Sequence, residues 1–170
     1  MRQLLGAMLI AASSWALGIA YVNVEKRRLR ALRSAEHMLR MMSGELSTRM
    51  TPLPELFSQL ENCCDDAAAA FVSNINDRLP SLGERMFTEI WNDSLSQSFS
   101  LLPLEDREIL STLGNCLGRY DLESQLAELG FALDQLDTAI ARHSTSLPER
   151  KRLGMGLAWA GGALLVIALL

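Results

Sequence analysis

Two long apolar segments lie at the two ends of the chain. Residues 4–24 are interrupted only by Ser13, Ser14 and Asn23, and residues 154–170 contain no strongly polar side chain. The first segment has 21 residues, close to the roughly 20 that a helix needs to cross a bilayer, and the second has 17, near the short limit. Soluble helices are rarely apolar on all sides. The two segments therefore predict two transmembrane helices around one soluble region.

Basic residues flank both segments on their inner sides, whereas Arg2 alone lies outside them. Because cytoplasmic flanks of membrane helices are enriched in Lys and Arg, this asymmetry predicts a cytoplasmic central region with both termini on the opposite side. A signal peptide and a buried soluble helix are alternatives for the first segment. The length of the segment and the basic residues directly after it argue against a signal peptide. Its apolar side chains on all sides of the helix argue against a buried soluble helix. The inner basic residues are Lys26, Arg27, Arg28, Arg30, Arg33, Arg150, Lys151 and Arg152.

We expect three parts: an N-terminal anchor (1–25), a cytoplasmic helical region (26–152) and a C-terminal anchor (153–170). All 20 acidic residues lie between Glu25 and Glu149. From position 34 to the last of them there are seven basic and 19 acidic residues, a balance of −12. Such a charge disfavours nucleic acid and suits a domain held near an anionic membrane by basic flanks. A partner with a basic surface and a merely solvated acidic surface both stay open.

The central region is predicted to be all-α, because apolar residues recur at spacings of three and four without long alternating runs. Six helices are expected, forming a bundle between the two membrane helices. The first continues from the N-terminal anchor to about Thr51, and the last carries a heptad seam that packs antiparallel on it. Thr51 with Pro52 predicts the start of the second helix, Asp65 a cap for the third, and Ser81 to Glu84 a capping box for the fourth. The apolar stripes, in chain order, are Leu32, Ala35, Leu39, Met42 and Leu46; Leu53, Leu56, Phe57 and Leu60; Ala68, Phe71, Val72, Ile75 and Leu79; Met86, Phe87, Ile90 and Trp91; Ile109, Leu113, Cys116 and Leu117; and Leu122, Leu126, Leu129, Leu133, Leu136, Ile140, His143 and Leu147.

No catalytic, cofactor-binding or metal-binding residue is predicted. The sequence has no glycine-rich phosphate loop with Lys, no H-E-x-x-H and no G-x-S-x-G. Cys63, Cys64 and Cys116 lack the spacing of metal ligands and indicate small structural thiols in a reducing compartment. The acidic pair of Glu105 and Asp106 suits the start of a helix. We therefore expect a protein that is not an enzyme.

Small residues in the two apolar segments allow helices to approach closely, within this chain or against a partner. Ser14 and Gly18 form one small-xxx-small pair, and Gly154 and Ala158 form another. A plain lipid-facing role is an equal alternative. The packing candidates are Gly6, Ser14, Gly18, Gly154, Ala158 and Gly162.

Four segments occur in a defined order along the chain. They are Leu4 to Ile10 (LLGAMLI), Thr51 to Leu56 (TPLPEL), Asp106 to Leu110 (DREIL) continuing through Leu113-Gly114 to Leu117-Gly118 with Asp121 and Gln125, and Leu153-Gly154 to Leu170. With this order and its double anchor, the chain resembles the stage III sporulation protein AB family of endospore-forming bacteria. It departs from the family at Pro148, where a charged helix usually continues, and at Arg49-Met50, where an aromatic residue and a glycine are more usual.

The resemblance implies a soluble part similar to the six-helix cytoplasmic domain of the type II secretion F component. It also implies a non-catalytic platform subunit of the channel between mother cell and forespore, in the mother-cell membrane. Such a subunit docks a cytoplasmic secretion-type ATPase and works with other membrane proteins of the same assembly. A platform of a secretion or pilus-like system outside sporulation is the alternative, a membrane-bound enzyme with an unrecognised site is a third, and homo-oligomerisation stays open. Our candidate partner-contact residues are Thr51, Pro52, Pro54, Glu55, Glu105, Asp106, Arg107 and Glu108.

Overall fold

The computed structural model describes residues 2–49, 51–117 and 121–144, without the side chains of residues 2–18 and 21. The chain divides into two units. One unit is residues 28–141, and the other combines the chain ends, 1–27 and 142–170. Each unit is described separately below.

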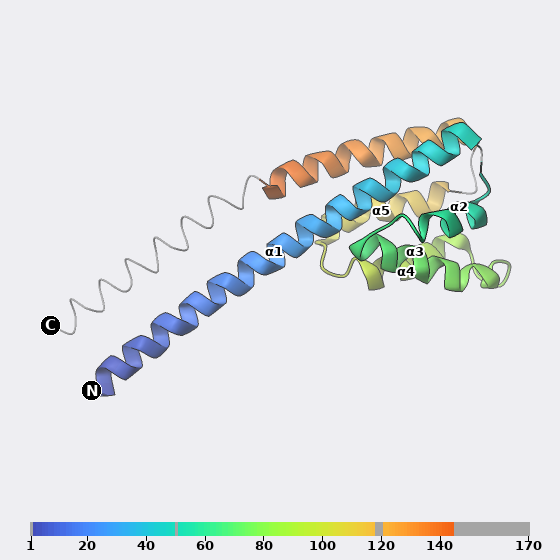
Figure 1. The fold of residues 1–170 in the computed structure, drawn as a ribbon. Helices are drawn as coiled ribbons and strands as arrows, with labels where there is room; N and C mark the ends of the chain where they lie inside the picture. Colours follow the sequence, from blue (N-terminus) through green and yellow to red (C-terminus); the bar gives the residue numbers. More distant parts are fainter. Residues whose placement is uncertain (1, 50, 118–120, 145–170) are drawn as a thin grey trace. The chain divides into compact units, whose positions relative to one another are not determined.

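Six α-helices account for most of the described residues, and no strand occurs among them, which confirms the all-α prediction. Figure 1 shows their order along the chain. The elements are α1 (Arg2–Arg49), α2 (Leu53–Leu60), α3 (Asp66–Arg78), the short 3-10 turn η1 (Leu79–Ser81), α4 (Phe87–Ser98), α5 (Leu104–Cys116) and a sixth helix at residues 122–144.

The first helix, α1, is continuous through 48 residues, so the first soluble helix continues directly from the N-terminal apolar segment, as predicted. Within the described part of the chain, no helix is both long and apolar enough to span a bilayer. The second apolar segment, 154–170, lies outside the described residues, as do the side chains of 4–18. The same holds for the packing candidates Gly6, Ser14, Gly18, Gly154, Ala158 and Gly162.

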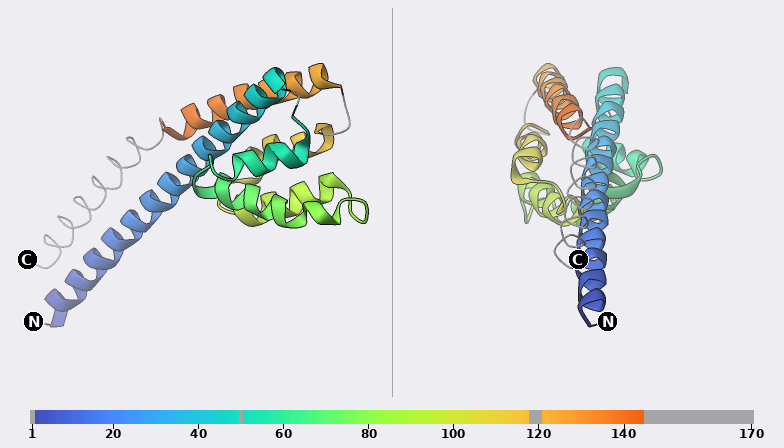
Figure 2. Two further views of the ribbon diagram at one scale, coloured as in Figure 1. Left: turned by 45° about the vertical axis from the view of Figure 1, so that its right-hand side comes forward. Right: turned by 90° about the vertical axis from the view of Figure 1, so that its left-hand side faces the viewer.

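In the unit of residues 28–141, α1 runs beside the sixth helix with α2 to α5 packed against them (Figures 1 and 2). The five predicted stripe residues of α1, from Leu32 to Leu46, are each at most 4% exposed, which confirms that stripe. Ala31 and Met38 are buried as well, so α1 buries a wider face than the stripe alone. A helix with neighbours on two sides needs this wider apolar face.

Aromatic rings form the centre of the core between α2, α3 and α4. Trp91 is fully buried and meets Phe71 edge to face, with the ring centres 4.8 Å apart. The rings of Phe57 and Phe87 lie 6.3 and 5.9 Å from it. The indole Nε1–H of Trp91 donates to the Leu110 carbonyl of α5 at 2.8 Å, which satisfies its one polar group.

The close approach of α4 and α5 depends on Gly114. A Cβ atom at this position would lie 2.5 Å from Cδ1 of Trp91, closer than real carbon contacts come. The glycine therefore makes room for the indole ring, and Thr88 Oγ1 donates to the Gly114 carbonyl at 3.1 Å beside it. Its neighbour Leu110 is fully buried although it was not in the predicted stripe of this helix.

The predicted helix caps differ from the observed ones. The N-cap residue of α2 is Pro52 rather than Thr51. Asp65 occupies the N-cap position of α3, as predicted, but its side chain makes no capping bond. Ser34 of α1 supplies that cap instead: its hydroxyl donates to the Asp65 carbonyl at 2.5 Å and accepts from Ala68 N–H at 3.0 Å. An N-terminal helix N–H needs an acceptor, and here a residue 34 positions away provides it.

The capping box expected at Ser81 to Glu84 does not start the fourth helix. Ser81 ends η1 and donates through its hydroxyl to the Arg78 carbonyl at 2.6 Å, and Gly83 turns the chain with φ +113°. Helix α4 begins only at Phe87. Met86, predicted to be buried, is 61% exposed because it precedes that helix.

The sixth helix buries a stripe turned slightly from the predicted seam. Leu129 and Leu136 of the seam are fully buried, but Ala132 and Ala139 join them, at 3% and 2% exposure. The flanking seam residues Leu122, Leu126, Leu133 and Ile140 are half-buried, and Leu147 lies outside the described residues. Two alanines on the inner face permit a close approach between helices.

Candidate functional site

The two predicted contact segments lie at different places on the unit of residues 28–141. Residues 51–55 follow the C-terminal end of α1, whereas residues 105–108 lie in the first turns of α5. Arg28 Nε donates to the Leu101 carbonyl at 3.0 Å, which ties the α4–α5 loop to the start of this unit. From there to the end of α1 at Arg49 the helix rises about 30 Å. The two segments therefore form two separate surfaces.

At the first surface, only part of the predicted set is accessible. Thr51 is buried, 7% exposed, so its side chain belongs to the fold. Pro52, Pro54 and Glu55 are exposed, and Glu55 accepts a long bond from Gln59 at 3.4 Å. Two prolines fix the backbone at the start of α2, and the surface that remains is small and stiff.

At the second surface, Asp106 is buried at 1% exposure in the first turn of α5. A carboxylate at this position is stabilised by the helix dipole. Arg107 is half-buried, and its Nε has no hydrogen-bond partner among the described residues. Glu105 and Glu108 are exposed. Their accessible carboxylates sit beside the loop that Arg28 holds.

The structure reveals a third surface that the sequence interpretation missed. Phe131, on the outer face of the sixth helix, is 64% exposed, the largest exposed aromatic side chain of the described residues. The exposed residues Ala127 and Glu128 precede it by four and three positions, and Asp134 follows by three. Residues three and four apart share one helix face, so an aromatic ring stands between two carboxylates. We call Phe131, Glu128 and Asp134 the Phe131 surface.

The sequence held a signal for the Phe131 surface. Phe131 lies two positions after Leu129 and two before Leu133, so it falls off the apolar seam of its own helix. A large aromatic side chain off the buried stripe of an amphipathic helix is a candidate anchor for a partner, because aromatic residues are enriched at protein interfaces.

Firm packing supports the helix that carries this surface. Leu129 and Leu136 anchor its inner face, and Asp137 accepts from Arg40 of α1 at 3.1 Å across an exposed ion pair. The start of the helix is capped by Asp121, whose carboxylate accepts from Ser124 N–H at 3.3 Å and from the Ser124 hydroxyl at 2.7 Å. These bonds lower the pKa of the Asp121 carboxyl, so it stays charged.

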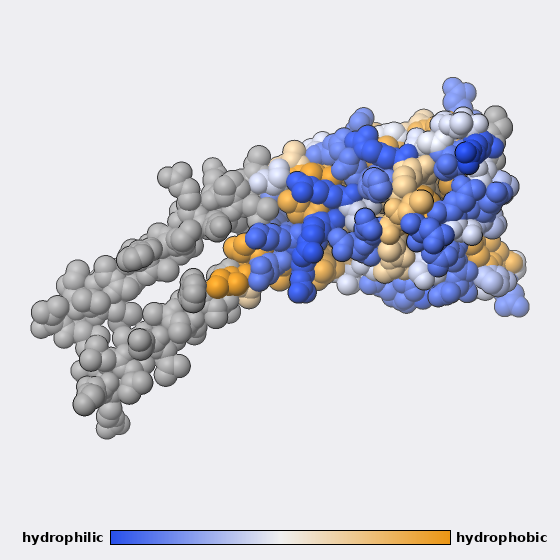
Figure 3. All heavy atoms as spheres, in the orientation of Figure 1, coloured by the Kyte–Doolittle hydropathy of each residue, from blue (hydrophilic) through white to orange (hydrophobic). Residues whose placement is uncertain are grey.

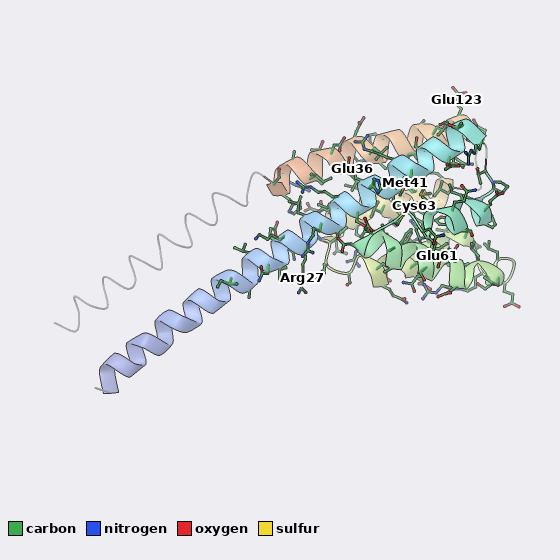
Figure 4. All side chains as sticks on the ribbon, viewed as in Figure 1. Arg27, Glu36, Met41, Glu61, Cys63 and Glu123 are labelled. Carbon is green, nitrogen blue, oxygen red and sulfur yellow. The ribbon has the colours of Figure 1, made fainter. Side chains whose placement is uncertain are left out.

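Acidic groups extend along the same helix. Glu123 is exposed near its start, as Figure 4 shows. Together with Asp121, Glu128 and Asp134 it gives the outer face a negative potential around the aromatic ring. Figure 3 shows hydrophilic side chains over much of one face of the molecule, interrupted by apolar patches. An aromatic residue with an acidic rim is suited to contact a basic protein surface.

The described residues provide little for chemistry. No group of three or more His, Cys, Asp or Glu among them is placed to hold a metal ion. The three cysteines are free, with Cys63 exposed, Cys64 buried and Cys116 half-buried. Burial, with the nearby Cys63 and Asp65, raises the pKa of the Cys64 thiol to about 11. A thiol that holds its proton this firmly is a poor nucleophile at neutral pH.

In the unit formed by the chain ends, His143 and Glu25 make a close polar contact. His143 Nδ1 and Glu25 Oε1 lie 2.7 Å apart, and both side chains are largely buried. The pair joins α1 to the sixth helix just before the described residues end. His143 was predicted as a seam residue, and its half-buried ring contacts Glu25.

Comparisons with known proteins agree on one family. The family model for stage III sporulation protein AB matches residues 3–170. A solved structure of a stage III sporulation protein AB (SpoIIIAB) shares the fold with a TM-score of 0.64 at 23% sequence identity, covering 72% of this chain and 97% of that chain. A search of curated proteins gives no match. Since the family model covers nearly the whole length, the chain belongs to the stage III sporulation protein AB family.

Proposed function

We propose that this chain is a non-catalytic membrane platform subunit of the sporulation channel complex and docks a cytoplasmic secretion-type ATPase. Family membership supports the role in sporulation and weighs against a secretion or pilus system outside it. The apolar chain ends support two membrane anchors in the mother-cell membrane, with residues 28–141 on the cytoplasmic side. Other membrane proteins of the assembly and the lipid bilayer would contact those anchors.

The observation that carries the docking proposal is the Phe131 surface. Leaving a Phe side chain exposed forgoes about 1.5–3 kcal/mol of burial free energy, which a partner recovers when it covers the ring. Aromatic anchors of this kind dominate the binding energy of protein interfaces. The chain keeps Phe131 outside its own core while burying Leu129 two positions away. Packing in the core accounts for the buried Leu129, and docking of a partner would account for the exposed Phe131.

The acidic rim specifies the chemistry of that partner. Glu128 and Asp134 flank the ring, and Glu123 continues the negative surface toward the start of the helix. We infer that the ATPase presents an apolar pocket edged with Lys or Arg. Complementary rim charges mainly raise the association rate and select the partner, whereas the aromatic anchor supplies affinity. Pro52, Pro54 and Glu55 are proposed as a second, smaller contact.

Site-specific photo-crosslinking tests the docking surface in sporulating cells. A photoreactive amino acid at position 131 should form an adduct with the secretion-type ATPase. The matched control is position 96 on α4, where Ser96 is exposed and belongs to neither proposed contact. An ATPase adduct from position 131 and none from position 96 supports the proposal. No adduct from position 131, or equal adducts from both, overturns it.

A further inference from the structure

We propose that a basic amphipathic helix of the docking partner crosses the sixth helix (orange in Figure 1) at Gly130. This inference rests on the proposed function and specifies how the partner binds. The contact is a face of four exposed residues, Ala127, Gly130, Phe131 and Asp134. Their spacing of i, i+3, i+4 and i+7 on one continuous helix forms the hole that receives a knob side chain where two helices pack. We call these four residues the Gly130 face.

Gly130 has no packing role within its own chain. A Cβ atom at this position would have nothing within 4 Å, whereas one at Gly114 would meet the indole ring of Trp91. The backbone at Gly130 is helical, so no turn of the chain requires glycine there. Glycine in the interior of a helix is destabilising relative to alanine. Nothing among the described residues therefore offsets the loss of helix stability at position 130.

A glycine beside an exposed aromatic ring suits a helix in close contact. The distance between two packed helices depends on the side chains at their crossing point, and glycine permits the closest approach of another backbone. Ala127, one turn before Gly130, keeps the same face low, and Phe131 projects beside it with 64% exposure. The partner backbone would pass over Gly130 while the Phe131 ring packs against its side.

The charges of the sixth helix specify a basic partner rather than a second copy of this chain. From Asp121 to Ala141 the sequence has five carboxylates and no Lys, Arg or His. Two copies meeting through the Gly130 face would bring like charges together, which is unfavourable. Lys or Arg residues beside the apolar stripe of a partner helix would instead meet Glu128 and Asp134.

Gly44 of α1 provides a matched control. A Cβ atom at this exposed helical position would also have nothing within 4 Å. The exposed residues one turn away from it are Arg40, Ser47 and Thr48, so no exposed large apolar side chain lies beside it. Gly44 therefore shares the open helical glycine with the Gly130 face but lacks its aromatic ring.

Stability and binding should respond to Gly130→Ala with opposite signs. The substitution should raise the melting temperature of the full-length chain, because alanine is the better helix former. It should also weaken binding to the purified secretion-type ATPase by at least about fivefold, because a methyl group overpacks the helix crossing. Gly130→Leu should weaken binding further. Gly44→Ala should raise the melting temperature as well but leave the affinity unchanged.

Two binding results would overturn the crossing helix. One is a Gly130→Ala chain that binds the ATPase as tightly as the unsubstituted chain or more tightly, and the other is an equal loss of affinity in Gly44→Ala. Phe131→Ala separates this inference from the proposed function. If Phe131→Ala weakens binding and Gly130→Ala does not, the docking surface stands without the crossing helix. If neither substitution weakens binding, the docking surface itself fails.

The occupant of the Gly130 face is identified by crosslinking. Photoreactive amino acids at positions 131 and 134 of the full-length chain are irradiated with the ATPase, and the adducts are mapped by mass spectrometry. Adducts at positions three, four or seven residues apart in one Lys- or Arg-bearing segment of the ATPase support a crossing helix, because such residues share one helix face. Adducts on unconnected loops, or on a second copy of this chain, overturn it.

Discussion

Trp91 and Phe131 are two large aromatic side chains with opposite exposure to solvent. Trp91 has no exposed surface, packs against three other rings and donates its one N–H to Leu110. Phe131 is 64% exposed on a helix whose inner face is fully buried. Trp91 contributes to the packing of the core, whereas Phe131 leaves apolar surface exposed to water. Stability and partner binding should therefore depend on different residues, and the following changes test that separation.

The largest expected effect is on the stability of the Trp91 region. Trp91→Ala should lower the free energy of unfolding by about 3–5 kcal/mol, because it removes a buried ring and leaves a cavity. Phe131→Ala should change it by less than about 0.5 kcal/mol, since its ring contributes little to the folded state. Denaturant unfolding of the full chain in detergent, followed by helical circular dichroism, measures both. Equal losses for the two variants would contradict the comparison.

Substitutions of Gly114 and Gly130 test the same contrast between a packed and an exposed position. Gly114→Ala places a methyl group 2.5 Å from Trp91 and should destabilise the fold by about 1–3 kcal/mol through overpacking. Gly130→Ala has nothing within 4 Å and should stabilise its helix by about 0.5–1 kcal/mol. Thermal unfolding of both variants gives the sign directly. A stabilising Gly114→Ala would mean that α4 and α5 do not pack as described.

A smaller effect is expected where α1 caps α3. Ser34→Ala removes the hydroxyl that binds Ala68 N–H and the Asp65 carbonyl, and should cost about 1 kcal/mol. Ser58→Ala, on the exposed face of α2, is the control and should be close to neutral. Hydrogen exchange at the first amides of α3 should rise in the first variant alone. Unchanged hydrogen exchange at these amides would show that Ser34 does not cap α3.

The smallest effect concerns the adjacent thiols. Cys63 is exposed, whereas the buried Cys64 has its pKa raised to about 11. At pH 8 a thiol reagent should modify Cys63 quickly and Cys64 slowly, because the reactive form is the thiolate. The rate at Cys64 should climb as the pH rises from 9 towards 11. Mass spectrometry of single-cysteine variants measures both rates, and equal rates at pH 8 would show that Cys64 is not buried.

The repeating features of this fold were predictable from the sequence. Spacings of three and four identified six helices and the buried stripe of α1, because burial on one face of a helix leaves a periodic pattern. Features that join distant residues were not predictable. The Ser34 cap of Ala68 and the fit of Gly114 to Trp91 depend on tertiary geometry that no local pattern encodes.

The candidate contact surfaces were only partly predictable. Exposed Pro54 and Glu55 were identified, but Thr51 and Asp106 proved buried because helix starts draw their flanking residues into the fold. Phe131 was not among the predicted contact residues. The prediction for this helix considered its apolar seam, and Phe131 lies outside that seam. A residue that breaks a helical pattern without a structural benefit is where a function should be sought.

Binding of the full-length chain in lipid nanodiscs to the secretion-type ATPase tests the central claim most directly. The account predicts micromolar binding that changes with nucleotide and that weakens at least about tenfold in Phe131→Ala. Leu104→Ser should leave this affinity unchanged, since this exposed leucine begins α5 and does not belong to the sixth helix. Binding that ignores Phe131→Ala would contradict the docking surface, and no binding in any nucleotide state would contradict the role as a platform for the ATPase.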